Sequence, residues 1–187
     1  MTLQIMMQPT PNPNAMKFIV SMDLIADGKA TFNDPDEAKE IPLANRLLNL
    51  ANVTQAHFFE NVMTVTQNGV SDWGILEKSV EKILREELPR HNPSFSGPES
   101  KVKNRKLSME NLPEEIIKIE EILQRTIRPG LQADGGDVEV VDYKDNILSI
   151  RYEGACGSCP SAMYGTLEAI RSIMKSEFDP NVEVVAI

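Results

Sequence analysis

The chain has 187 residues, of which 41% are hydrophobic and 25% charged, which is typical of a globular protein with one or two domains. Its net charge of −9 opposes binding to phosphate backbones, so we expect no nucleic-acid partner. No segment approaches the ~20 apolar residues of a membrane span, and we expect no membrane partner either. The only two cysteines, Cys156 and Cys159, cannot form a disulfide framework, which indicates a reducing compartment.

Charge and composition divide the chain into three parts. Residues 1–88 carry a net charge of −5, residues 89–111 carry +3, and residues 112–187 carry −7. The middle part is rich in proline and serine and lacks apolar periodicity, so it cannot bury enough surface to offset its ordering entropy. We therefore expect two small α+β domains, 1–88 and 112–187, joined by a flexible linker over 89–111.

The first expected domain has the order β-β-α-β-β-α. Prolines and asparagines over residues 9–14 exclude a helix there. A turn signal at Asp27-Gly28 predicts a hairpin between the first two strands. The expected strands are residues 16–22, 28–32, 53–59 and 62–67, and the expected helices are residues 42–50 and a segment that begins after Ser71 or Asp72. Because this domain has no thiols, we expect it to recognise partner proteins.

The second expected domain has the order α-β-β-α-β. Its first helix begins near Pro113, carries a helix-spaced apolar stripe and ends at Arg128-Pro129-Gly130. The stripe consists of Ile116, Ile119, Leu123 and Ile127. The expected strands are residues 138–140, 147–152 and 182–185, and the second helix runs from Ser161 to about Glu177.

The two thiols lie where a loop enters this second helix. Pro160 suits the first helical position, which places Cys159 at or next to the N-cap. The helix dipole and the unpaired N–H groups there favour a thiolate over a thiol. Gly157 allows the backbone to fold so that both sulfurs point the same way.

Four uses of this pair compete. A thiol–disulfide oxidoreductase also uses Cys-X-X-Cys at a helix start, but there the motif follows the first strand of a βαβ unit. A structural zinc site needs four ligands, and because His57 and His91 lie elsewhere, zinc would have to bridge two chains. The pair could also be two unreactive small residues. A cubane iron–sulfur cluster takes four thiolates, so two chains would have to meet at it. A cluster exposed between two chains would be easy to release, as a carrier requires.

The motifs resemble those of a known family. Arg128-Pro129, Asp134-Gly135-Gly136-Asp137 and Gly154–Ser161 are similar to the C-terminal domain of NifU, which is shared with the Nfu iron–sulfur carrier proteins. Thr10–Asn14, Lys17-Phe18, Pro42–Ala44 and Val62–Thr66 before Trp73 resemble the Nfu N-terminal domain. Together the two resemblances cover nearly the whole chain outside the linker.

The resemblance implies a carrier without enzymatic activity. It would receive a [4Fe–4S] cluster from an upstream assembly scaffold, hold it between two chains as a cluster-bridged homodimer, and pass it to apo iron–sulfur proteins. The cluster ligands of the family correspond to Cys156 and Cys159. The further cysteine-bearing regions of NifU itself are absent. Because the N-terminal domain begins almost at Met1, we expect a cytoplasmic protein, bacterial rather than organellar.

Several other residues are of types that can carry function. Asp134 and Asp137 are interpreted as parts of a structural turn rather than an acid–base pair. Met163 and Met174 are interpreted as core residues, although Met163 is one turn from Cys159 and could help to cover a cluster. The basic stretch of Lys101, Lys103, Arg105 and Lys106 is interpreted as a solvated linker face.

Two positions on the strand at 53–59 complete these candidates. His57 is interpreted as an ordinary strand residue. Alternation requires a core position for one of Phe58 and Phe59, which leaves the other available for a partner surface.

Overall fold

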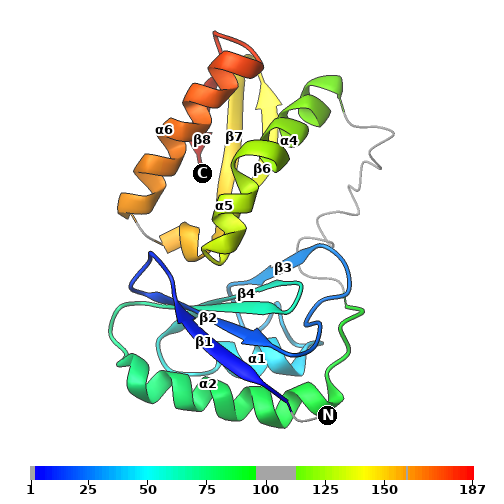
Figure 1. The fold of residues 1–187 in the computed structure, drawn as a ribbon, viewed down its shortest axis with the longest axis vertical. Coiled ribbons are helices and arrows are strands. Elements are labelled where there is room, and N and C mark those ends of the chain that lie inside the picture. The colour runs from blue at the N-terminus through cyan, green and yellow to red at the C-terminus, as the bar shows by residue number, and fades with distance from the viewer. Residues whose placement is uncertain (1–2, 96–112, 159) are drawn as a thin grey trace.

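The computed structural model describes residues 3–95, 113–158 and 160–187. Two α+β units lie one above the other along the long axis, each with its own sheet and helices (Figure 1). The α+β class predicted from the sequence is confirmed. Across the described residues, no helix combines the length and the apolar character needed to cross a membrane.

The N-terminal unit is an antiparallel sheet covered by helices on one face. The strand order is β1-β2-β5-β4-β3, and every neighbouring pair is antiparallel. Helices α1 and α2 lie on the face that points away from the C-terminal unit (Figure 1). The elements, in chain order, are β1 (Ile5–Pro9), β2 (Ala15–Val20), β3 (Lys29–Phe32), α1 (Pro42–Leu48), β4 (Val53–Phe59), β5 (Val62–Gln67), α2 (Trp73–Glu87) and η1 (Leu88–Arg90).

Alternation along the strands decides which side chains enter this core. Phe18, Phe58 and Met63 face the helices and are fully buried. The residues that alternate with them along each strand lie on the opposite face of the sheet, which is turned toward the C-terminal unit (Figure 1). The helix-spaced stripe of α2 is buried as expected, with Leu76, Val80 and Ile83 in the core. Phe59 is only partly buried, so the prediction that one of the two phenylalanines enters the core is confirmed.

The predicted hairpin between residues 16–22 and 28–32 is wrong. Strand β2 pairs with β1 and β5, and β3 pairs with β4 at the opposite edge of the sheet. The connection between β2 and β3 is not a tight turn, because it places Leu24 and Ile25 in the core. Strand β1 was not predicted, since an edge strand with exposed Met6 and Met7 lacks the alternating pattern of a half-buried strand.

Residues just beyond position 88 pack against the N-terminal unit. The Pro93 carbonyl accepts a hydrogen bond from the Ala26 N–H, and the Phe95 ring lies against Phe32 and Phe58. The beginning of the segment expected as linker is therefore held by aromatic contacts with this core. The rest of that segment, with Lys101, Lys103, Arg105 and Lys106, lies outside the described residues.

The C-terminal unit packs three helices against a small mixed sheet. Its strand order is β6-β7-β8, with β6 and β7 antiparallel and β7 and β8 parallel. The core includes Ile119, Leu123 and Met174, and Ile127 packs against it, so these three members of the predicted stripe and the core position of Met174 are confirmed. The fourth member, Ile116, is half-buried and is not part of this core. The elements are α4 (Glu114–Thr126), α5 (Arg128–Ala133), β6 (Gly136–Lys144), β7 (Ile147–Gly154), η4 (Ala155–Ser158), α6 (Pro160–Glu177) and β8 (Glu183–Ala186).

The first helix of this unit ends at Thr126, just before Arg128-Pro129-Gly130, as predicted. The sequence did not predict that a second short helix, α5, begins at Arg128, with Pro129 in its first turn, where its missing N–H costs nothing. One local prediction needs correction. Asp137 is not in a turn, because β6 already begins at Gly136 and Asp137 is buried within it.

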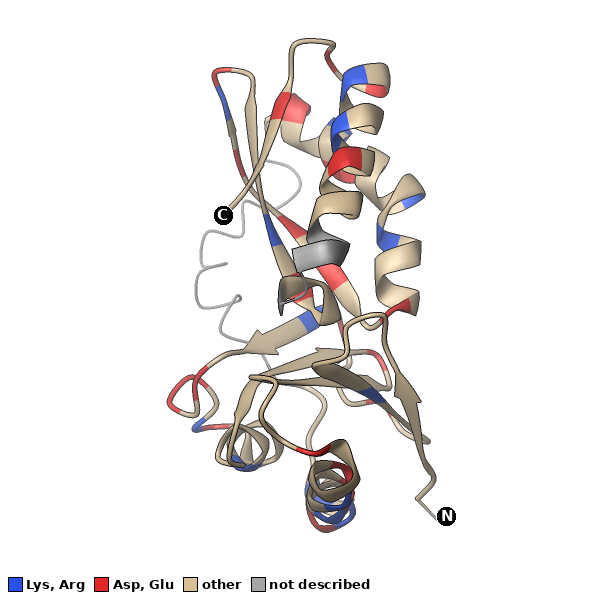
Figure 2. Ribbon diagram, turned by 90° about the vertical axis from the view of Figure 1, so that its left-hand side faces the viewer, with Lys and Arg blue, Asp and Glu red and all other residues tan. Residues whose placement is uncertain are grey.

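The helices keep a solvated outer face. Acidic and basic residues are mingled along the helices of both units (Figure 2). Such mixed-sign faces are typical of helices that pack one stripe on a core and turn the other side to water. The contact between the two units is instead made by the free face of the N-terminal sheet with α5, η4 and the adjoining ends of β6 and β7.

Candidate functional site

Cys156 lies in the short η4 turn that connects β7 to α6. It is 8% exposed and belongs to the apolar core of the C-terminal unit. The helix that follows begins at Pro160, as the sequence predicted for its first position. Cys159, the second predicted ligand, lies outside the described residues, as does the Met163 side chain. The two sulfurs therefore stay a pair by sequence only.

Gly136 makes room for the sulfur of Cys156. A Cβ atom at this position would lie 2.4 Å from Cys156 Sγ, 2.8 Å from the Glu153 carbonyl oxygen and 2.9 Å from the Cys156 nitrogen. Gly154 has φ +61°, and a Cβ there would meet the Gly135 carbonyl oxygen at 2.4 Å. Gly136 of the Asp134–Asp137 motif and Gly154 at the end of β7 thus allow β6 to approach the cysteine turn closely.

Tyr152 is a buried neighbour of the cysteine turn. Burial, with a smaller contribution from the charge of Cys156, raises the pKa of Tyr152 to about 12. Its phenol therefore stays protonated at neutral pH.

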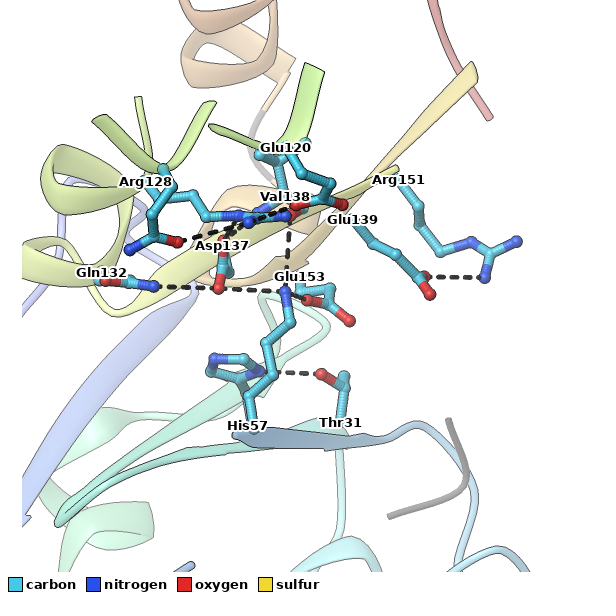
Figure 3. Close-up of polar contacts among 12 residues, drawn as sticks. Thr31, His57, Glu120, Arg128, Gln132, Asp137, Val138, Glu139, Arg151 and Glu153 are labelled. Carbon is cyan, nitrogen blue, oxygen red and sulfur yellow. Dashed lines mark hydrogen bonds and ion pairs between the residues drawn. The ribbon is translucent and has the colours of Figure 1, made fainter. Parts of the chain in front are cut away.

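Buried charges lie one strand position away from these glycines, and they come from both units. Asp137 on β6 and Glu153 on β7 are cross-strand partners, and Lys29 of β3 forms ion pairs with both, at 3.0 Å from Asp137. Arg128 lies 3.4 Å from the same Asp137 and 2.6 Å from Glu120 (Figure 3). Burial lowers the pKa of Lys29, but the two carboxylates outweigh it and the pKa is raised. Lys29 therefore stays charged between them.

His57 lies directly below this cluster on β4. It is 2% exposed, and a hydrogen bond of 2.8 Å joins its Nδ1 to the Thr31 hydroxyl (Figure 3). Burial lowers the pKa of His57 to about 4, with Lys29 adding to the effect and Glu153 and Asp137 opposing it. The imidazole is consequently neutral at physiological pH and brings no charge to the cluster.

Comparison with known proteins assigns the family. The sequence model described as "Scaffold protein Nfu/NifU N terminal" matches residues 5–91, and that of the NifU-like domain matches residues 119–185. The human NFU1 iron–sulfur cluster scaffold homolog, named as mitochondrial, is 30% identical over 179 residues that cover 95% of this chain and 69% of the human protein. The chain belongs to the Nfu/NifU family of iron–sulfur cluster scaffold proteins.

Other relatives agree with this assignment. A NifU-like protein of Schizosaccharomyces pombe is 29% identical and matches over 95% of this chain and 70% of its own length. The mitochondrial NFU1 homolog of Drosophila willistoni is 26% identical and matches over 98% of this chain, which spans 63% of the fly protein. Membership in a scaffold family does not favour the thiol–disulfide oxidoreductase. The expected bacterial cytoplasmic location finds no support in relatives that are named mitochondrial.

The two cysteines and the Gly135-Gly136 pair all lie within the residues that match the NifU-like domain. Asp134 and Asp137 do not form an acid–base pair. Asp134 is exposed, whereas Asp137 is buried and forms ion pairs with Lys29 and Arg128. Among the described residues, no three His, Cys, Asp or Glu side chains are grouped as a metal site.

The residues that sequence reasoning missed are Lys29, Glu153 and Asn12, which join the two units. No local pattern marks a contact between residues more than a hundred positions apart. His57, interpreted as an ordinary strand residue, proves to lie in this contact.

Proposed function

We propose that this chain carries a [4Fe–4S] cluster between two copies of itself and delivers it to apo iron–sulfur proteins. Cys156 and Cys159 of each copy are the ligands, so that two chains supply the four thiolates of a cubane. The observation that carries the proposal is the Cys156-X-X-Cys159 pair within the NifU-like match, the chain's only thiols.

The geometry around Cys156 supports this role. The cysteine lies in the short 3-10 helix η4 rather than inside a long helix or strand, and Gly136 leaves the sulfur without a side chain on that flank. A four-residue 3-10 helix can adjust to a large ligand more readily than a long regular element can, because fewer backbone hydrogen bonds must break. The cluster is transferred by this site and is not a permanent cofactor of it, because a carrier must release the cluster intact.

Delivery requires an exchange of ligands without net oxidation or reduction. Thiols of the recipient lose their protons as their sulfurs bind iron, and the sulfurs of the carrier gain protons as they leave. The carrier's task is therefore to hold the cluster weakly enough to give it up, and no catalytic residue is needed. On this proposal the protein acts as a carrier rather than an enzyme.

The N-terminal unit is proposed to choose the recipients. It has its own core and no cysteine, so its contribution is recognition rather than cluster binding. The proposed domain plan is residues 1–88, 89–111 and 112–187, with the start of the linker, up to Phe95, packed on the N-terminal core. An assembly scaffold is the proposed upstream donor. A reducing compartment such as the cytoplasm is the proposed setting.

Transfer to a recipient tests the function directly. Protein reconstituted anaerobically with iron and sulfide is mixed with an apo-hydrolyase whose activity depends on a [4Fe–4S] cluster, in the presence of an iron chelator. We expect the recipient to regain activity with the carrier, but not with free iron and sulfide, because the chelator removes iron that passes through solution. Equal recovery in both arms, or none in either, would contradict carrier function.

A further inference from the structure

The face of the N-terminal sheet that α1 and α2 do not cover carries a row of polar residues. Lys17 on β2 pairs in register with Thr64 on β5, Thr64 with His57 on β4, and His57 with Thr31 on β3. Lys29 stands two residues before Thr31 and therefore shares this face. We call these five residues the polar row. A sheet face that turned only to water would leave its central side chains exposed, but His57 and Thr64 are almost completely buried.

The partner of the polar row is the segment that holds Cys156. Lys29 binds Asp137 and Glu153, and Lys17 donates a hydrogen bond to the Ala133 carbonyl oxygen. Beside the row, Asn12 Nδ2 donates to the carbonyl oxygen of Ala155, the residue next to the cysteine, at 2.8 Å. These contacts cover one side of the cysteine turn.

Two glycines let the surfaces meet this closely. A Cβ at Gly135 would lie 2.6 Å from Lys17 Cγ and 2.7 Å from the Thr64 hydroxyl. A Cβ at Gly154 would lie 3.0 Å from His57 Cδ2. The two glycines of the Asp134–Asp137 motif therefore serve two contacts. Gly136 leaves space for the sulfur of Cys156, and Gly135 leaves space for the N-terminal sheet.

The contact is built to separate without unfolding either unit. The two apolar cores share no residue among those described, and the connecting contacts are ion pairs and hydrogen bonds. The Thr64 hydroxyl is buried in the contact without a hydrogen-bond partner among the described residues. Polar interfaces of this kind are typical of domains that move relative to each other.

We infer that the polar row is a docking surface for the cysteine segment of the same chain, and that docking and cluster bridging exclude each other. A bridging cluster needs the cysteine turns of two chains face to face, whereas the docked N-terminal sheet occupies one side of that turn. The docking itself is independent of the cluster, and only its competition with bridging rests on the proposed function. By linkage, docking lowers the apparent affinity for the cluster, and cluster loading releases the N-terminal sheet to meet other partners.

Exchange of the buried charges tests the docking. In a Cys159→Ser background, the rate at which Ellman's reagent modifies Cys156 reports how often the turn is uncovered. We expect Lys29→Glu to raise this rate at least about tenfold, because three carboxylates then meet in one buried cluster. Adding Glu153→Lys restores opposite charges and should return the rate toward the parent value. Lys39→Glu is the matched control and should leave the rate unchanged, since Lys39 is an exposed lysine of the same unit whose ion pair, within the part of the chain that the structure describes, is with Asp36.

Small-angle X-ray scattering of the apo protein provides the second readout. We expect the radius of gyration to increase for Lys29→Glu and to return in the charge-exchanged double variant, with circular dichroism unchanged throughout. A parent chain that is already extended and reacts as fast as Lys29→Glu would overturn the docking. A compact form found only in dimers would overturn docking within one chain. If docking is found but the parent protein never binds a cluster, the docking stands and the proposed function fails.

Discussion

Replacing Cys156 by Ser should abolish stable cluster binding, and Cys159→Ser should do the same. The site is built from two chains, so one substitution removes two of its four thiolates. Reconstituted variants should retain less than about a tenth of the iron and sulfide of the parent, because serine replaces a soft thiolate by a poor ligand for a cubane. Iron and sulfide assays after gel filtration, in buffer free of other thiols, measure this.

The fold should survive both substitutions. Cys156 is a small member of the C-terminal core, so a buried serine hydroxyl should cost about 1–3 kcal/mol of the free energy of unfolding. Cys156→Ala serves as the matched control, because it removes the thiol without burying a hydroxyl and should lose the cluster as completely. A folded Cys159→Ser variant that binds the cluster as well as the parent would exclude the shared four-thiolate site.

Gly136→Ala should disrupt the packing of β6 against the cysteine turn. Two of the three atoms that the new Cβ would meet closest are backbone atoms, of Glu153 and Cys156, and the third is the sulfur itself. Backbone atoms cannot rotate away, so β6 and the cysteine turn must separate. We expect a loss of about 2–3 kcal/mol in the free energy of unfolding and a cluster affinity lower by about tenfold or more.

Gly165→Ala in α6 is the matched control for this effect. A Cβ at Gly165 meets nothing within 4 Å, so alanine should stabilise the helix by about 1 kcal/mol and leave cluster binding intact. Denaturant unfolding and iron assays on both variants separate the two expectations. If Gly136→Ala is as stable and binds the cluster as well as Gly165→Ala, the close approach at Gly136 is not required for stability or for cluster binding.

The sequence predicted what local patterns encode. Helix-spaced apolar stripes, such as Leu76, Val80 and Ile83, predicted the helices correctly. Alternation predicted correctly that one of Phe58 and Phe59 lies in the core. The Cys-X-X-Cys motif before Pro160 located the cysteine turn and the start of α6. Each of these signals lies within a window of a few residues, where periodicity and capping act.

The failures have a common physical cause, which is pairing over long sequence distances. A turn signal at Asp27-Gly28 suggested a hairpin, but the β4–β5 hairpin inserts between β2 and β3. Asp137 is predicted in a turn because the sequence does not show its buried partner Lys29, which comes from the other unit more than a hundred positions away. His57 had no local mark of its place at the contact between the units, since its surroundings come from β3, β6 and β7.

Iron, acid-labile sulfide and native mass, determined together on one anaerobically reconstituted sample, test the central claim most directly. The buffer must contain no glutathione or other thiol that could supply missing ligands. Two chains sharing one cubane predict a dimer with about four irons and four sulfides, which returns to monomers when the iron is removed. A monomer that holds a complete cubane, or a dimer that binds zinc and takes up no iron and sulfide, would contradict it.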